Sequence, residues 1–143
     1  MTSLLTIQDE ITAKVNELSQ DVYVTAVPDD VKIKHGANGL FLPYIVLMFS
    51  DVQEAANGQG IVSSRQNLGI SFCAIECVAP TERAARQVAE LVRNKLVGFS
   101  PTGAGEMRIA GGRVYGTVDA DGVPKKYISE ISFKYLINSV VSL

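Results

Sequence analysis

The chain has 143 residues, of which 47% are hydrophobic and 20% charged, and its net charge at pH 7 is −2. A chain of this length buries enough surface to fold without metal or disulfide bonds, so we expect a single domain over residues 1–143. The slightly negative net charge argues against a nucleic-acid-binding protein, because such binding needs clustered basic residues. The longest apolar run, residues 40–49, is shorter than the roughly 20 residues of a membrane-spanning helix, and the first residues lack the basic region of a secretion signal.

The start of the chain is patterned as a helix. Apolar residues recur there at intervals of three and four, with polar residues between them: Leu4, Ile7, Ile11, Val15 and Leu18. This pattern predicts one apolar stripe on an amphipathic helix, and Ser3 is placed as its N-cap. Residues 22–27 follow as a predicted strand, which Pro28 ends.

Two hydrophobic runs flank a polar stretch in the middle of the chain. Residues 41–49 are continuously hydrophobic, which is typical of a strand covered on both faces, although Pro43 limits pairing at its start. Residues 68–78 form the second run. The polar stretch 51–67 between them contains the turn signal Asn57-Gly58-Gln59-Gly60. We therefore expect an antiparallel hairpin with a long polar tip.

A second amphipathic helix is predicted after Pro80, with Thr81 as its N-cap and Gly98 just past its end. Its apolar side is made by Ala84, Ala85, Val88, Leu91, Val92 and Leu96. The rest of the chain is read as one strand made of the runs 107–110 and 112–118, a turn at residues 119–122, and a last strand over residues 126–137.

The resulting order of elements is α-β-β-β-α-β-β. Two helices that each carry one apolar stripe can cover one face of a sheet. The predicted fold class is therefore α+β: two layers, with about five strands in a mostly antiparallel sheet and both helices packed on one face.

The residues able to do chemistry are few and scattered. Cys73 and Cys77 lie on a predicted strand, which would place their Cα atoms about 13 Å apart, too far for a disulfide. With only His35 to join them they fall short of a four-ligand zinc site, so we interpret them as small buried residues and His35 as a solvated loop residue. The glycines at 103–105 and 111–112 match no phosphate-binding pattern. No catalytic, cofactor-binding or metal-binding residue is predicted.

The order of parts, from Leu42 to Ile137, resembles the tail terminator (tail completion) proteins of tailed bacteriophages. The resembling parts are the hydrophobic hairpin with its polar tip over residues 44–78 and the helix that opens with Pro80-Thr81 and continues to Arg93. The resemblance continues with the segment Leu96-Val97-Gly98-Phe99-Ser100-Pro101 and a closing hairpin that ends in residues 127–137. The leading helix over residues 4–18 also matches, so the resemblance covers most of the chain.

This resemblance implies a structural virion protein. Such proteins form a ring, commonly a hexamer, on the head-proximal end of the tail tube, where the ring stops tube polymerisation and joins the tail to neck or connector proteins. The implied partners are further copies of this chain, the tail tube protein and a neck or head-completion protein, with DNA only passing through the lumen. The implied location is the virion tail, assembled in the host bacterial cytoplasm, with no membrane and no cofactor.

A head-to-tail ring buries a different patch on each side of every subunit. The chain offers two candidate patches: the polar loop 51–67 and the basic exposed side of the second helix. We expect arginines of that helix to contact acidic groups on a neighbouring subunit or on the tube. The candidate subunit and tube interface residues are Asp51, Gln53, Glu54, Arg65, Arg83, Arg86 and Arg93.

Three other functions stay open. The chain could be another part of the same machine, such as a head–tail adaptor, a tail tube subunit or a baseplate component, and images of the pure protein would separate closed rings from open tubes. A small-molecule binding domain would show ligand-induced thermal shifts in a monomer. An enzyme that uses His35, or Cys73 and Cys77, would lose function when these residues are replaced by Ala.

Overall fold

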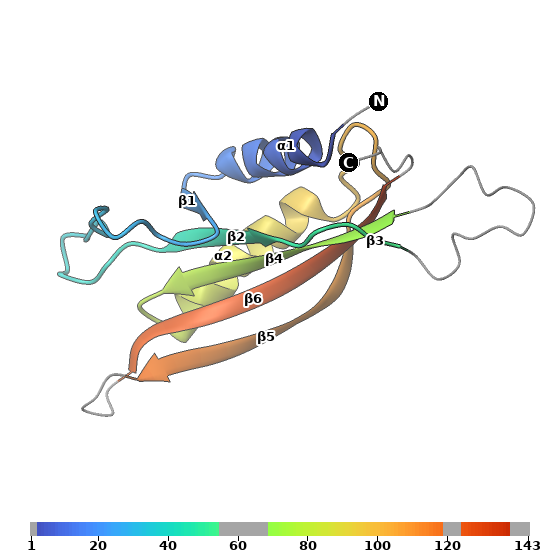
Figure 1. Ribbon diagram of the computed structural model, residues 1–143. Helices are drawn as coiled ribbons and strands as arrows, with labels where there is room; N and C mark the ends of the chain where they lie inside the picture. The colour runs from blue at the N-terminus through green and yellow to red at the C-terminus, as the bar shows by residue number, and fades with distance from the viewer. Residues whose placement is uncertain (1–2, 55–68, 119–123, 138–143) are drawn as a thin grey trace, which may run out of the picture.

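Two helices lie on one face of a twisted sheet (Figure 1). The computed structural model describes residues 3–54, 69–118 and 124–137. The elements are α1 Leu4–Asn16, β1 Asp21–Val24, β2 Tyr44–Phe49, β3 Gln53–Glu54, β4 Gly69–Ala79, α2 Glu82–Leu96, β5 Arg108–Val118 and β6 Pro124–Ile137. None of the helices in the described ranges is long and apolar enough to cross a membrane.

The sheet has the strand order β1-β2-β4-β6-β5, with the two-residue β3 pairing beside β4. β1 runs parallel to β2, and every other pair is antiparallel. The predicted fold class is thereby confirmed, and so is the hairpin between the two hydrophobic runs, which are β2 and β4. β3 is an addition to the predicted order. The predicted turns at residues 57–60 and 119–122 lie outside the described residues.

Local sequence signals begin both helices where they were predicted. The Ser3 side chain accepts a hydrogen bond from the Thr6 backbone N–H, and the Thr81 side chain accepts one from the Ala84 N–H, each at 3.1 Å. Each cap stabilises its helix by about 1 kcal/mol. α1 ends at Asn16, sooner than its apolar stripe, because the chain turns there to enter β1 and Leu18 packs at the edge of the core.

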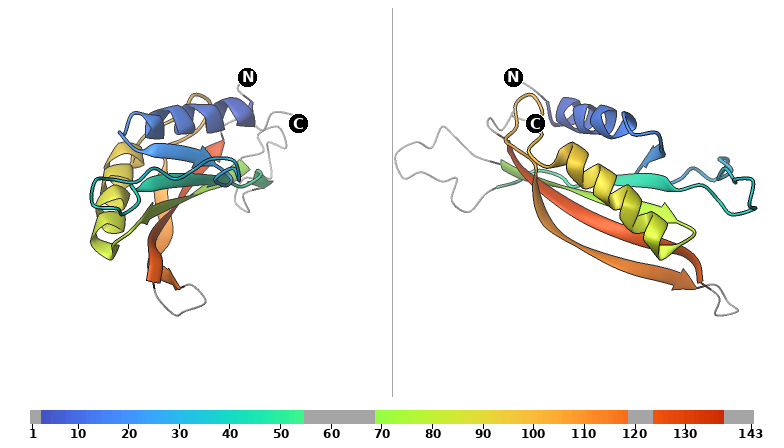
Figure 2. Two further views of the ribbon diagram at one scale, coloured as in Figure 1. Left: turned by 90° about the vertical axis from the view of Figure 1, so that its left-hand side faces the viewer. Right: turned by 180° about the vertical axis from the view of Figure 1, so that it is seen from behind.

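Alternation along the strands separates two apolar layers. Figure 2 shows both helices on the same face of the sheet. Side chains of β4 and β6 that point to this face form the main core with the apolar stripes of α1 and α2. On the opposite face, Tyr44, Val46, Val78 and Ile128 form a second, smaller cluster. This cluster is covered by the segment between β1 and β2, residues 25–43, which we call the arm.

Several predicted strand boundaries differ from those of the structure. β1 ends at Val24 instead of residue 27, because Thr25 adopts a left-handed φ of 74° and its N–H turns to Leu47 O at 2.7 Å. Residues 107–110 and 112–118 belong to one strand, as the predicted order of elements requires; this strand, β5, begins at Arg108 and passes Gly111 through a bulge. β6 begins at Pro124, two residues before the predicted start. The prediction of Gly98 just past the end of α2 is confirmed, with a φ of 83°.

Candidate interaction surfaces

The exposed side of α2 carries the arginines that the sequence pointed to. Arg83, Arg86 and Arg93 are all exposed, and the ten-residue separation places Arg93 about 15 Å along the helix axis from Arg83. Arg86 Nε lies 3.6 Å from Glu82 Oε1, with both side chains more than half exposed. Among described residues, Arg83 and Arg93 have no ion-pair partner. The helix therefore presents cations that are available to another molecule.

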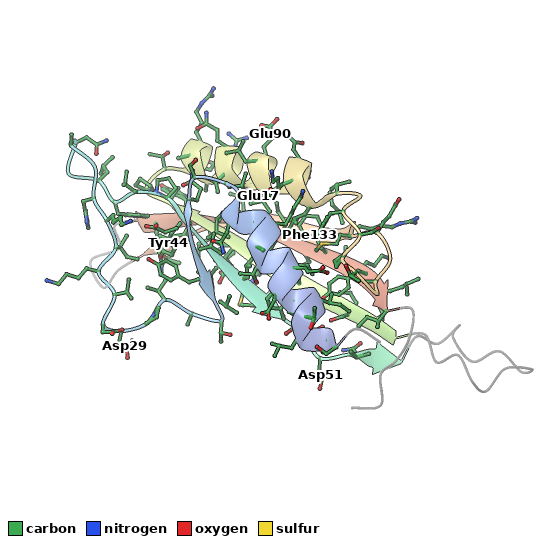
Figure 3. The ribbon with its side chains drawn as sticks, turned by 90° about the horizontal axis from the view of Figure 1, so that it is seen from above. Glu17, Asp29, Tyr44, Asp51, Glu90 and Phe133 are labelled. Carbon is green, nitrogen blue, oxygen red and sulfur yellow. The ribbon has the colours of Figure 1, made fainter. Side chains whose placement is uncertain are left out.

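The second predicted patch lies at the far end of the sheet. Asp51 is exposed, and its Oδ1 accepts a hydrogen bond from the Val52 N–H at 2.8 Å. Gln53 and Glu54 form β3 and pair with the start of β4, whereas α2 begins after the end of β4. The start of β4, where β3 pairs, is therefore about 30 Å along the strand from the start of α2. Figure 3 shows Asp51 and Glu90 of α2 far apart.

The structure thus does not bring the two patches together into one site. Arg65, together with residues 55–68 of the predicted loop patch, lies outside the described residues.

A groove between α2 and β5 was not predicted. α2 packs on β4 and β6 and leaves the helix-side face of β5 largely uncovered. Ile109 and Val114 of β5 lie on that face opposite Phe133 and Ser129, and their side chains are 45% and 44% exposed. Arg93 lines the same groove, whose volume is about 290 Å³. We call it the α2–β5 groove.

On the opposite face of the sheet, a polar network balances two opposed carboxylates. Glu76 and Glu130 are direct cross-strand partners, an arrangement that destabilises a sheet when nothing compensates it. The Tyr115 hydroxyl donates to Glu76 Oε2 at 2.8 Å, and Arg113 Nε lies 3.8 Å from Glu130 Oε2. The Arg113 guanidinium also lies 4.8 Å from the centre of the Tyr115 ring. Partial burial and the hydrogen bond to Glu76 raise the pKa of Tyr115. The network therefore offsets the repulsion between the two carboxylates, because Arg113 pairs with Glu130 and Glu76 accepts a hydrogen bond from the neutral Tyr115.

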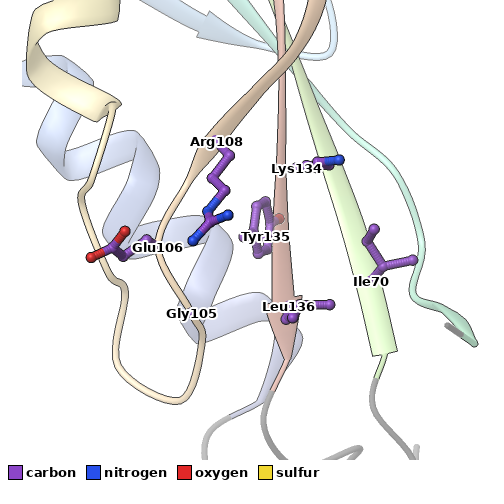
Figure 4. A pocket seen from close by; sticks show the side chains of 7 residues that line it. All are labelled: Ile70, Gly105, Glu106, Arg108, Lys134, Tyr135 and Leu136. Carbon is purple, nitrogen blue, oxygen red and sulfur yellow. The ribbon is translucent and has the colours of Figure 1, made fainter. Parts of the chain in front are cut away.

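A second cavity, of about 430 Å³, lies where β6 ends and β5 begins (Figure 4). Arg108 and Lys134 face each other across the two strands. In Figure 4 the Lys134 and Leu136 side chains point toward β4, and Arg108 lies between Glu106 and Tyr135. The cations of Arg108 and Lys134 and the carboxylate of Glu106 line this cavity.

Both cysteines are buried and free, as predicted. Burial raises the pKa of the Cys73 and Cys77 thiols to about 12, so they remain protonated at neutral pH and are poor nucleophiles. His35 is exposed in the arm, where its Nδ1 lies 3.0 Å from Ile33 O. Within the described ranges, no three His, Cys, Asp or Glu side chains gather as metal ligands would.

Comparisons with known proteins find likeness in structure but not in sequence. No protein-family model matches the chain, and no curated protein matches it. A chain described as "Virion of native gene transfer agent (GTA) particle" superposes with a TM-score of 0.62 at 14% identity, covering 94% of this chain and 93% of that one. A second solved structure, whose name states no function, has a TM-score of 0.51 at 15% identity and covers 96% and 94%. At these identities the likeness shows a shared fold over almost the whole chain.

Proposed function

We propose that this chain is a structural protein of a phage-like particle, and specifically a tail terminator. Copies of the chain close into a hexameric ring on the head-proximal end of the tail tube, stop tube polymerisation and join the tail to a neck or connector protein. The observation that carries the proposal is the fold shared with a gene transfer agent virion chain over 94% of this chain. The resemblance of the element order to tail terminators supports the narrower role.

The surfaces fit a protein that acts through contacts. A head-to-tail ring needs two different patches on each subunit, and the exposed arginines of α2 and the residues around Asp51 lie in different parts of the surface. The net charge of −2 suits a tube that passes DNA without holding it, because a strongly basic lining would bind phosphates. No part of this role needs an enzyme or a cofactor.

The experiment is assembly of the purified full-length chain. Sedimentation equilibrium gives the mass in solution, and negative-stain images distinguish closed rings from open tubes. We then add the protein to tubes growing from the tail tube subunit of the same particle. Closed hexameric rings that attach to one tube end and stop its growth support the proposal.

Open tubes formed by the chain alone would instead assign it to the tail tube. A monomer at every concentration, without effect on tube growth, would contradict both roles.

A further inference from the structure

Residues 28–31, in the first half of the arm, form a turn in which all four residues are exposed. We propose that residues 28–31, which we call the arm tip, insert into the α2–β5 groove of the next copy of this chain. The inference rests on the proposed function, because it names the contact that would close the ring. It commits to a second copy of the chain as the occupant of the groove.

The arm is anchored on both sides of this turn. Before it, the Thr25 N–H donates to Leu47 O at 2.7 Å, and after it the chain forms a short hairpin. His35 and Phe41 form an antiparallel bridge, with the Gly36 N–H donating to Leu40 O at 2.8 Å and the Leu42 N–H to Lys34 O at 2.7 Å. The Phe41 and Tyr44 rings pack with their centres 6.0 Å apart. A segment fixed in this way can present its tip without a large ordering cost on binding.

The tip combines two carboxylates with an apolar side chain. The Val31 N–H donates to Pro28 O at 3.0 Å and closes the turn. Asp29 and Asp30 are exposed, Val31 is 37% exposed, and Asp29 points away from the body of the subunit (Figure 3). Neither aspartate forms an ion pair with another described residue.

The groove offers the complementary chemistry. Arg93 supplies a cation at one wall, and Ile109 and Val114 supply apolar surface at the other. Gly112 keeps the strand close to β6, because a Cβ there would lie 2.4 Å from Glu130 O. An aspartate of the tip can therefore meet Arg93 while Val31 packs on the apolar wall.

The order of the strands indicates that the arm tip enters the groove of another subunit and not that of its own. The arm follows β1 at one edge of the sheet, and the groove lies along β5 at the other edge. With four strand spacings between them, these edges are roughly 19 Å apart within one copy. A surface at one edge and its complement at the opposite edge give a heterologous contact, which closes into a ring when the rotation between subunits is right.

The first test reverses the charges on each side. We compare wild type, Arg93→Glu, the double variant Asp29→Lys with Asp30→Lys, and the combination of all three, by sedimentation at matched concentrations. Each reversal is expected to weaken assembly at least about tenfold, and the combination to recover most of the loss. Asp9→Lys on the exposed side of α1 is the matched control, with assembly unchanged. Thermal unfolding monitors the fold of every variant.

The second test uses disulfide trapping between copies. Val31→Cys and Val114→Cys are made in separate chains, and the native cysteines are buried. Mixing the two under oxidation should give a cross-linked dimer, while Leu5→Cys, on α1, mixed with Val114→Cys should not.

The two levels of the proposal fail in different ways. The arm-in-groove contact alone would be overturned if wild type forms rings, the charge-reversed variants assemble as well as wild type, and no Val31–Val114 cross-link forms. A wild-type chain that never self-associates would overturn the ring and this contact together.

Discussion

Glu10 of α1 binds Thr102 in the loop that follows α2. Its Oε2 accepts a hydrogen bond from the Thr102 backbone N–H at 2.7 Å, and its Oε1 accepts one from the Thr102 hydroxyl at 2.8 Å. Lys95 of α2, whose Nζ lies 3.5 Å from Glu17 Oε2, adds a second link to α1. One carboxylate thus ties the first helix to the loop that leads into β5, across 92 residues of chain.

Replacement of Glu10 by Ala should loosen this loop. Two hydrogen bonds to one carboxylate are lost at a partly exposed site, so we expect the free energy of unfolding to fall by about 1–2 kcal/mol. Urea denaturation measures the change. Asp9→Ala, at the neighbouring exposed position, is the control and should change stability by less than about 0.5 kcal/mol. Equal effects of the two variants would contradict the role of the Glu10–Thr102 contact.

Gly112→Ala should distort β5. The added Cβ would meet the Glu130 carbonyl oxygen at 2.4 Å, and backbone on a paired strand cannot easily move away. We expect a loss of about 1–3 kcal/mol, which is typical of overpacking. At Gly105 the nearest atom to an added Cβ is at an ordinary 3.7 Å, so Gly105→Ala is the matched control. Thermal unfolding of both variants checks the difference, and a neutral Gly112→Ala would refute this close approach.

These contacts show what the sequence could and could not predict. Helix caps depend on a few adjacent residues, so Ser3 and Thr81 were recognisable from the sequence. The helical period was likewise enough to predict that Arg83, Arg86 and Arg93 are exposed. The place of Arg93 in a groove depends instead on strand order, because β5 is an edge strand that α2 does not cover.

Leu91, which was predicted on the apolar side of the second helix, is 47% exposed, because the face of α2 that packs on the sheet runs through Val88, Val92 and Leu96. Strand order explains two further exposed residues. Ile109 and Val114 are of the residue types usual in buried strands, yet their side chains are nearly half exposed, because both helices pack over the centre of the sheet and not over its edge strand β5. The arm has no periodic pattern, and its fold over Tyr44 and Ile128 depends on β1 pairing parallel to β2, which no local signal encodes. The left-handed Thr25 that ends β1 is an uncommon conformation for a threonine.

Tyr135→Phe should leave the protein as stable as wild type or more stable at pH 7. The Tyr135 hydroxyl is buried near its cross-strand neighbour Ser71, but it makes no hydrogen bond of normal geometry to a described residue. Burying a hydroxyl without a partner costs about 1–3 kcal/mol, and phenylalanine keeps the ring while removing that cost. Chemical denaturation at pH 7 measures the effect. A loss of more than about 1 kcal/mol would indicate that the hydroxyl has a partner.

The pH dependence of the free energy of unfolding, compared between wild type and Tyr135→Phe, tests the burial of this hydroxyl. Burial raises the pKa of Tyr135 from 10.0 to about 12, so the folded state holds this proton more tightly than the unfolded state. The resulting stabilisation is present below pH 10 and is lost as the pH rises toward 12. Wild type should therefore lose stability more steeply than Tyr135→Phe between pH 10 and 11. The raised pKa of the Cys77 thiol acts equally in both proteins and cancels in the comparison, whereas the charge of Cys73 adds to the rise in the Tyr135 pKa.

Reversing charge at the start of α2 should impair function while leaving the fold intact. Arg83 and Arg86 are exposed, and the Arg86–Glu82 pair is a surface ion pair worth at most about 1 kcal/mol. The double variant Arg83→Glu with Arg86→Glu should therefore unfold within a few degrees of wild type. If these arginines contact acidic groups on a neighbour or on the tube, tube capping should weaken at least about tenfold. Capping assays at two salt concentrations check this, because screening should reduce the difference between wild type and variant at high salt. Unchanged capping would show that this face of α2 is solvated and that the ring and tube contacts lie elsewhere.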